Sequence, residues 1–164
     1  MKTKIVVSNT LPILNLAIIK RLDILKAFFR TVHIPDMVWK ELVIDGGDRK
    51  EGKLIKKSDF LEIHTIHDMN LYQLLRKDLD RGESGAICLS IELKTSLILL
   101  DESEARRIAD IYNLKKTGVL GILLKAKKEK IISSLREEIR KLKENAGFFI
   151  SKELEESLLK EADE

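Results

Sequence analysis

Short apolar runs alternate along the chain with longer segments of helical periodicity. Between the runs, apolar residues recur every three or four positions, as in Ile18, Leu22, Leu25 and Phe29, and this spacing predicts amphipathic helices. Strands that alternate with helices form a parallel sheet with helices on both faces. The pattern therefore predicts an α/β fold with four to five strands. The expected strands cover residues 4–8, 31–34, 60–66, 97–100 and, as a shorter fifth, 114–116.

The length and composition of the chain are typical of one globular domain. Its 164 residues are 44% hydrophobic, which is enough to bury a core and argues against disorder. The sequence has neither an internal repeat nor a convincing linker, so we expect a single domain over residues 1–164, with residues 133–164 as a C-terminal helical extension packed on it. The net charge of +3 is too small to indicate a nucleic-acid partner by itself.

The sequence gives three indications of where the protein resides. Cys88 is the single cysteine, so an intrachain disulfide is excluded and a reducing compartment is favoured. No apolar run approaches the length of a membrane span, and Ile5–Val7 is too short for the core of a signal peptide. We therefore expect a cytoplasmic protein without a membrane partner.

Four polar residues lie where a parallel sheet of this kind would place a site. Asp101 follows an apolar strand, and Asn9 follows the first strand. Glu83 opens a helix beside two glycines, and Glu41 lies at the edge of the apolar stripe of another helix. Ligands of open parallel sheets bind beyond the carboxyl ends of the strands. These four residues are therefore candidates to surround a divalent metal ion through oxygen ligands.

Each of these residues also has a purely structural interpretation. Asp101 can cap the following helix, and Glu83 can stabilise a helix dipole. Glu41 can pair with a lysine or arginine, and Asn9 can cap a turn. The residue pattern alone leaves both interpretations open.

Other chemistries find little support in the sequence. His64 and His67 are three apart on an expected strand and would point to opposite faces, and His33 stands alone, so zinc is not indicated. Cys88 lies in a helix that is apolar nearly all round and reads as a core residue. The basic residues Lys125, Lys127 and Lys128 could follow an RNA backbone, but interspersed glutamates favour a solvated helix face with internal ion pairs.

Six segments of the chain carry a resemblance to a known family: residues 7–16, 34–42, 79–87, 99–102 with Ala105 and Arg106, 118–123 and 147–151. Taken in order, they resemble the PIN-domain family, in particular a prokaryotic branch of toxin-like members related to VapC. The resemblance implies an α/β/α sandwich and metal-dependent cleavage of RNA. It assigns the acidic site to Asn9, Glu41, Glu83 and Asp101, with Asp80 and Glu102 as supplements.

The chain departs from the family pattern at one position, because Asn9 stands where the first site residue is normally an aspartate. The leading hypothesis is a Mg²⁺- or Mn²⁺-dependent endoribonuclease, as the toxin of a toxin–antitoxin pair, with a small antitoxin protein as partner and a homodimer as its assembly. In this hypothesis Arg106 either contacts RNA phosphate or anchors Asp101 or Glu102. One alternative is a catalytically weakened module that binds RNA or a partner protein without cleaving. A second alternative is a structural or regulatory homo-oligomer.

Overall fold

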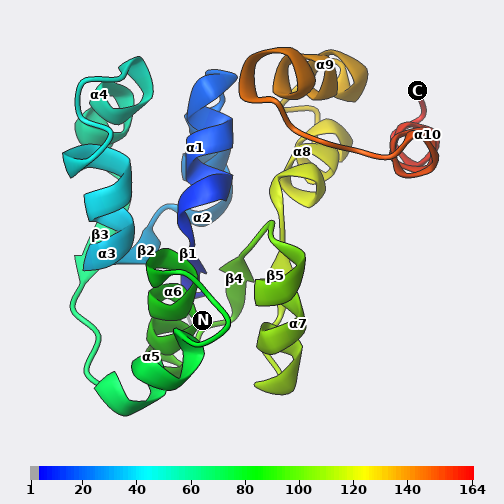
Figure 1. The fold of residues 1–164 in the computed structure, drawn as a ribbon. Coiled ribbons are helices and arrows are strands. Elements are labelled where there is room, and N and C mark those ends of the chain that lie inside the picture. The colour runs from blue at the N-terminus through cyan, green and yellow to red at the C-terminus, as the bar shows by residue number, and fades with distance from the viewer. Residues whose placement is uncertain (1–3) are drawn as a thin grey trace.

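A parallel sheet forms the centre of the computed structural model, which describes residues 4–164 (Figure 1). Within these residues the sheet has five strands in the order β3-β2-β1-β4-β5, and every neighbouring pair is parallel. This confirms the expected α/β fold. The strands are β1 (Val6–Ser8), β2 (Val32–Pro35), β3 (Leu61–His64), β4 (Leu97–Leu99) and β5 (Lys116–Thr117).

Helices cover the two faces of the sheet, as Figure 1 shows. They connect the strands in the alternating order that the sequence predicts. The α-helices are α1 (Thr10–Ile18), α2 (Leu22–Phe29), α3 (Asp36–Trp39), α4 (Lys50–Lys57), α5 (Met69–Leu75), α6 (Arg81–Leu93), α7 (Ser103–Ile111), α8 (Val119–Lys128), α9 (Leu135–Ala146) and α10 (Lys152–Glu161), and a π-helical turn, η1 (Lys40–Ile44), continues α3.

The hydrophobic core forms two clusters, one between each face of the sheet and the helices that cover it, because alternate strand residues face opposite sides. Val6 and Leu99 belong to the cluster that includes side chains of α1, α2, α4, α8 and α9. Val7 and Ile98 belong to the cluster that includes side chains of α5, α6 and α7. Strands buried on both faces read as continuous apolar runs, which explains why the sequence pattern located them.

The C-terminal segment joins the first of these clusters. Ser134 accepts a hydrogen bond from the Glu137 backbone N–H at 3.1 Å and so caps α9. Helix α9 packs against α1 and α8 and ends at Gly147, whose φ of 62° suits a glycine. Leu159 of α10 also reaches this core.

Two local predictions differ from the structure. The strand expected over 114–116 begins two residues later, at Lys116. The helix after Pro35 does not stay α-helical, since the Asp45 N–H donates to the Lys40 carbonyl five residues back.

Within residues 4–164, no helix is long and apolar enough to cross a membrane.

Candidate active site

The carboxyl ends of β1 and β4 lie side by side and bring the first site residues together. Ser8 is paired with Leu99, and the Asn9 N–H donates to the Leu99 carbonyl at 3.1 Å. The Asn9 amide nitrogen then lies 3.4 Å from Glu102 Oε2. Asn9 is buried and its side chain caps no helix, so the turn-capping interpretation of this residue is not what the structure shows.

Glu41 reaches the same place from the π-helical turn η1. The Thr10 hydroxyl donates to Glu41 Oε2 at 2.5 Å, which ties this carboxylate to the first turn of α1. A methyl group added at Gly82 would lie 2.8 Å from Asn9 Oδ1 and 2.9 Å from Glu41 Oε2. Only a glycine therefore lets the first turn of α6 approach both oxygens this closely.

Glu83 is held in a reciprocal capping box at the start of α6. The Asp80 N–H donates to Glu83 Oε1 at 3.0 Å, and the Glu83 N–H donates to Asp80 Oδ1 at 2.8 Å. Burial raises the pKa of Glu83 to about 7, and the charges of Asp80 and Glu102 act in the same direction. Glu83 therefore stabilises the start of α6, as one of its two interpretations predicted, and it does so as a buried acid close to Asp80 and Glu102.

Asp101 caps a helix, although not the one that follows it in sequence. Its Oδ1 accepts the Val119 N–H at 2.9 Å, at the start of α8. Gly118 is required here because an added Cβ would overlap Asp101 Oδ1. Burial raises the pKa of Asp101, and the Val119 hydrogen bond and Arg106 oppose the rise. Arg106 Nη1 donates to the Leu100 carbonyl at 2.8 Å, so it is anchored beside Asp101.

Glu102 connects the two halves of the group. Burial raises its pKa, as do the charges of Asp101 and Asp80, whereas the hydrogen bond from Asn9 lowers it. The structure thus brings Asn9 and Glu41 together at Gly82, and it couples Glu83 and Asp101 electrostatically through Glu102. Raised pKa values in several neighbouring acids are the expected result of burying like charges together.

The donor atoms of this group fit a hard divalent cation. Asn9 Oδ1 and Asp101 Oδ2 are buried and have no hydrogen-bond partner in residues 4–164. No three of the carboxylates bring ligand atoms within 4.8 Å of one another in the part of the chain that the structure describes, so a cation here would need bridging waters or movement of the side chains. Mg²⁺ retains several waters when it binds.

A family model matches this chain over nearly its full length. The model described as "DUF3368: PIN domain" covers residues 5–164. The chain belongs to the PIN-domain family. No curated protein matches it. PIN membership supports a nuclease-type function, a general dependence on divalent metal and RNA as the substrate class.

A shallow cavity of about 370 Å³ opens beside Asp101 in this PIN domain. Arg106 and Phe149 line it, and Phe149 is 88% exposed. Phe149 is not among the predicted site residues, although residues 147–151 are part of the family resemblance. The adjacent aromatic residues Phe148 and Phe149, in a chain with 5% aromatics, are the sequence signal that could have drawn attention to it.

The lysines of α8 lie towards the other end of their helix from Asp101. Lys127 donates to the Ser133 carbonyl at 2.6 Å, and Lys128 pairs with Glu161 at 2.6 Å. Lys125 stacks over the Phe28 ring with its nitrogen 4.6 Å from the centroid. These internal partners favour the interpretation of a solvated, ion-paired helix face in the PIN domain.

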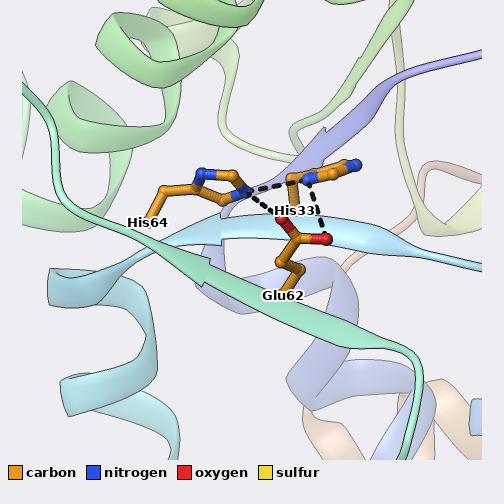
Figure 2. A group of neighbouring side chains, drawn as sticks. All are labelled: His33, Glu62 and His64. Carbon is orange, nitrogen blue, oxygen red and sulfur yellow. Dashed lines mark hydrogen bonds and ion pairs between the residues drawn. The ribbon is translucent and has the colours of Figure 1, made fainter.

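The prediction that His33 stands alone is wrong. Its Nδ1 lies 2.9 Å from His64 Nε2, and Glu62 lies beside both (Figure 2). Burial lowers the pKa of His33, as does His64, whereas Glu62 raises it. His67 remains apart and is paired with Glu92 at 3.4 Å. In residues 4–164 of the PIN domain, this trio is the group of ligand atoms that come within 4.8 Å of one another.

Proposed function

We propose that this PIN domain is a Mg²⁺- or Mn²⁺-dependent endoribonuclease. The observation that supports it is that Asn9 Oδ1 and Asp101 Oδ2 are two of the five buried side-chain oxygens without a hydrogen-bond partner in residues 4–164. Leaving a buried polar atom without a partner costs about 1–3 kcal/mol, and ligation of a cation would remove that cost. Both atoms lie at the carboxyl edge of the parallel sheet, where such folds bind ligands.

Glu41, Glu83 and Asp101 would hold the metal, with Asn9 as a neutral oxygen ligand and Asp80 and Glu102 as supplements. A bound divalent cation supplies an activated water and relief of charge on the scissile phosphate. The chain supplies the orientation of each ligand. The Thr10 hydroxyl holds Glu41, the Asp80 N–H holds Glu83, and the Val119 N–H holds Asp101.

RNA would approach over the cavity beside Asp101. Arg106 is fixed by the Leu100 carbonyl and lines this cavity, so a phosphate there would meet a positioned guanidinium. Phe149 offers an exposed ring on which a base can stack. Lys125, Lys127 and Lys128 already have partners inside the protein and would contribute less.

A second function is favoured by the contact of Asn9 with Glu102. The amide donates to this carboxylate at 3.4 Å, whereas an aspartate would place two negative charges together. The asparagine therefore makes the metal-free site more stable than the usual aspartate would. On this reading the protein binds RNA or a partner protein without cleaving it.

The wider assignment is also a proposal. We place the protein with the toxin-like members of the family, in the cytoplasm, as a homodimer with a small antitoxin protein as partner. We further propose that residues 1–164 form one domain with residues 133–164 as its helical extension, which the packing of α9 against α1 and α8 supports.

The experiment is cleavage of a labelled single-stranded RNA with Mg²⁺ or Mn²⁺ by wild type, Asp101→Asn and Asn9→Asp. The nuclease proposal expects cleavage by wild type, none by Asp101→Asn and none in EDTA. Cleavage by Asn9→Asp alone would favour the weakened module. A failure of all three proteins to cleave, with a melting temperature that is the same in Mg²⁺ and EDTA, would refute metal binding by these residues.

A further inference from the structure

Two neighbouring strands place two imidazoles and a carboxylate on one face of the sheet. In the β2–β3 pair, His33 lies opposite Glu62, and Pro35 lies opposite His64. Glu62 and His64 are two residues apart on β3, so their side chains leave the same face. The three side chains therefore converge because of the strand register. Figure 2 shows them in contact, with His33 on β2 and the other two on the edge strand β3.

The distances within this trio lie close to those between ligands of one metal ion. His33 Nδ1 and His64 Nε2 lie 2.9 Å apart, at hydrogen-bond distance, and Glu62 oxygens lie 3.3 Å from His64 Nε2 and 3.9 Å from His33 Nδ1. Ligand atoms at about 2.0–2.1 Å from a tetrahedral Zn²⁺ are separated by about 3.3 Å from each other. The observed separations lie on both sides of this value, so small rotations of the side chains would complete the site.

The exposure of the three side chains also suits a metal site with an open position. His33 and His64 are 18% and 23% exposed, which gives a half-buried pair of nitrogen ligands, whereas Glu62 is 57% exposed. Water can therefore reach the remaining coordination positions. As a plain surface ion pair, an acid this exposed would contribute little.

We propose that His33, Glu62 and His64 form a second metal site, selective for Zn²⁺ or a similar transition-metal ion. Imidazole nitrogen suits Zn²⁺, Ni²⁺ and Cu²⁺, whereas Mg²⁺ prefers oxygen ligands, so this site differs in chemistry from the carboxylate and amide oxygens near Asp101. The bound ion clips the edge strand β3 to β2. It stabilises the folded protein, because the three ligands come together only when β2 and β3 are paired.

The test measures metal binding and melting of tag-free, chelator-treated protein with ZnCl₂ and, separately, MgCl₂. Titration calorimetry is expected to give one Zn²⁺ at this site, and a hundredfold excess over the dissociation constant should raise the melting temperature by about 5–10 °C. His64→Ala is expected to weaken this binding by more than about tenfold, since changes beyond the ligands themselves already cost that much. His67→Ala is the matched control and should bind like wild type, because its side chain is 86% exposed and lies outside the trio.

Glu62→Gln covers the case in which His64→Ala fails to fold. Its side chain is exposed, so the fold is expected to remain while Zn²⁺ affinity falls. Co²⁺ bound to wild type should show the visible absorption of a four-coordinate nitrogen and oxygen site, and Asp101→Asn should retain it. Zn²⁺ binding that survives in His64→Ala and Glu62→Gln, or that disappears in Asp101→Asn, would overturn the proposal. So would wild-type protein that binds Zn²⁺ no better than Mg²⁺.

Discussion

Replacing Asn9 by aspartate should change stability in a way that depends on metal. The amide nitrogen of Asn9 lies 3.4 Å from Glu102 Oε2. Asn9 is only 2% exposed. A hydrogen bond to a charged group contributes about 1.5–3 kcal/mol, and the length of this one favours the lower end. Two carboxylates at that distance repel by about 5 kcal/mol at an effective dielectric constant of about 20, although proton uptake limits this cost.

We therefore expect Asn9→Asp to lose about 2–4 kcal/mol in EDTA near pH 7.5. For a chain of this size the melting temperature should fall by about 5–15 °C. Saturating Mg²⁺ should recover more than half of the loss, because a cation between the two carboxylates replaces repulsion by attraction. Thermal melts of wild type and variant, each with EDTA and with Mg²⁺, measure both quantities.

Two further proteins separate this cause from a general effect of the substitution. Asn70→Asp, on the exposed first turn of α5, should melt within about 2 °C of wild type in both buffers. In a Glu102→Gln background, Asn9→Asp should cost less than about 1 kcal/mol, since the repulsion is gone. Equal losses with and without Mg²⁺, or an unchanged loss in Glu102→Gln, would refute the reasoning.

Three other predictions concern the same edge of the sheet. Because the folded pKa of Glu83, about 7, lies above its unfolded value, its contribution to stability is complete below about pH 4.5 and is lost as pH rises through 7. Glu83→Gln should therefore stabilise the metal-free protein at pH 8, on the order of 1–3 kcal/mol, and flatten the pH dependence of urea unfolding; a steeper dependence would contradict this. Gly82→Ala should abolish Mg²⁺-dependent stabilisation and cleavage while costing only about 1–3 kcal/mol of stability, and a variant that retains wild-type Mg²⁺ affinity would show that the close approach is dispensable. Phe149→Ala should weaken RNA binding, measured by fluorescence anisotropy, by roughly 5- to 100-fold with little change in melting temperature, whereas Ile111→Ala, which removes another exposed apolar side chain, should not; equal effects would argue against stacking.

The order of elements and the placement of two site residues could be predicted from sequence because they depend on local pattern. The apolar run 97–100 ends at Asp101, and the first strand ends at Asn9, so both were expected at the same edge of a parallel sheet. The burial of α6 followed in the same way from its continuous apolar surface, and Ala86 to Leu89 are indeed buried.

The remaining features depend on which residues face each other across the fold. The contact of His33 with His64 requires the register of β2 against β3, which no spacing within one strand reveals. Asp101 caps α8 through a residue 18 positions further along the chain. Local sequence pattern indicates only a cap on the next helix, so this contact could not be predicted. The cavity beside Phe149 likewise depends on how the segment after α9 returns to the sheet.

The π-helical turn after Glu41 has a consequence for how the chain can vary in length. A π turn takes up one residue more than an α turn, and the helical segments on either side keep their direction. Deleting one residue within the turn would therefore restore an α turn without rotating the rest of the chain. Glu41 lies at the start of the turn and would keep its place beside Thr10. A change of length after Ile44 cannot be taken up in this way and would separate Gly46 from Gly52 of α4, whose backbones lie close together. Insertions and deletions after Ile44 would thus displace α4, whereas Glu41 precedes them and keeps its contact with Thr10.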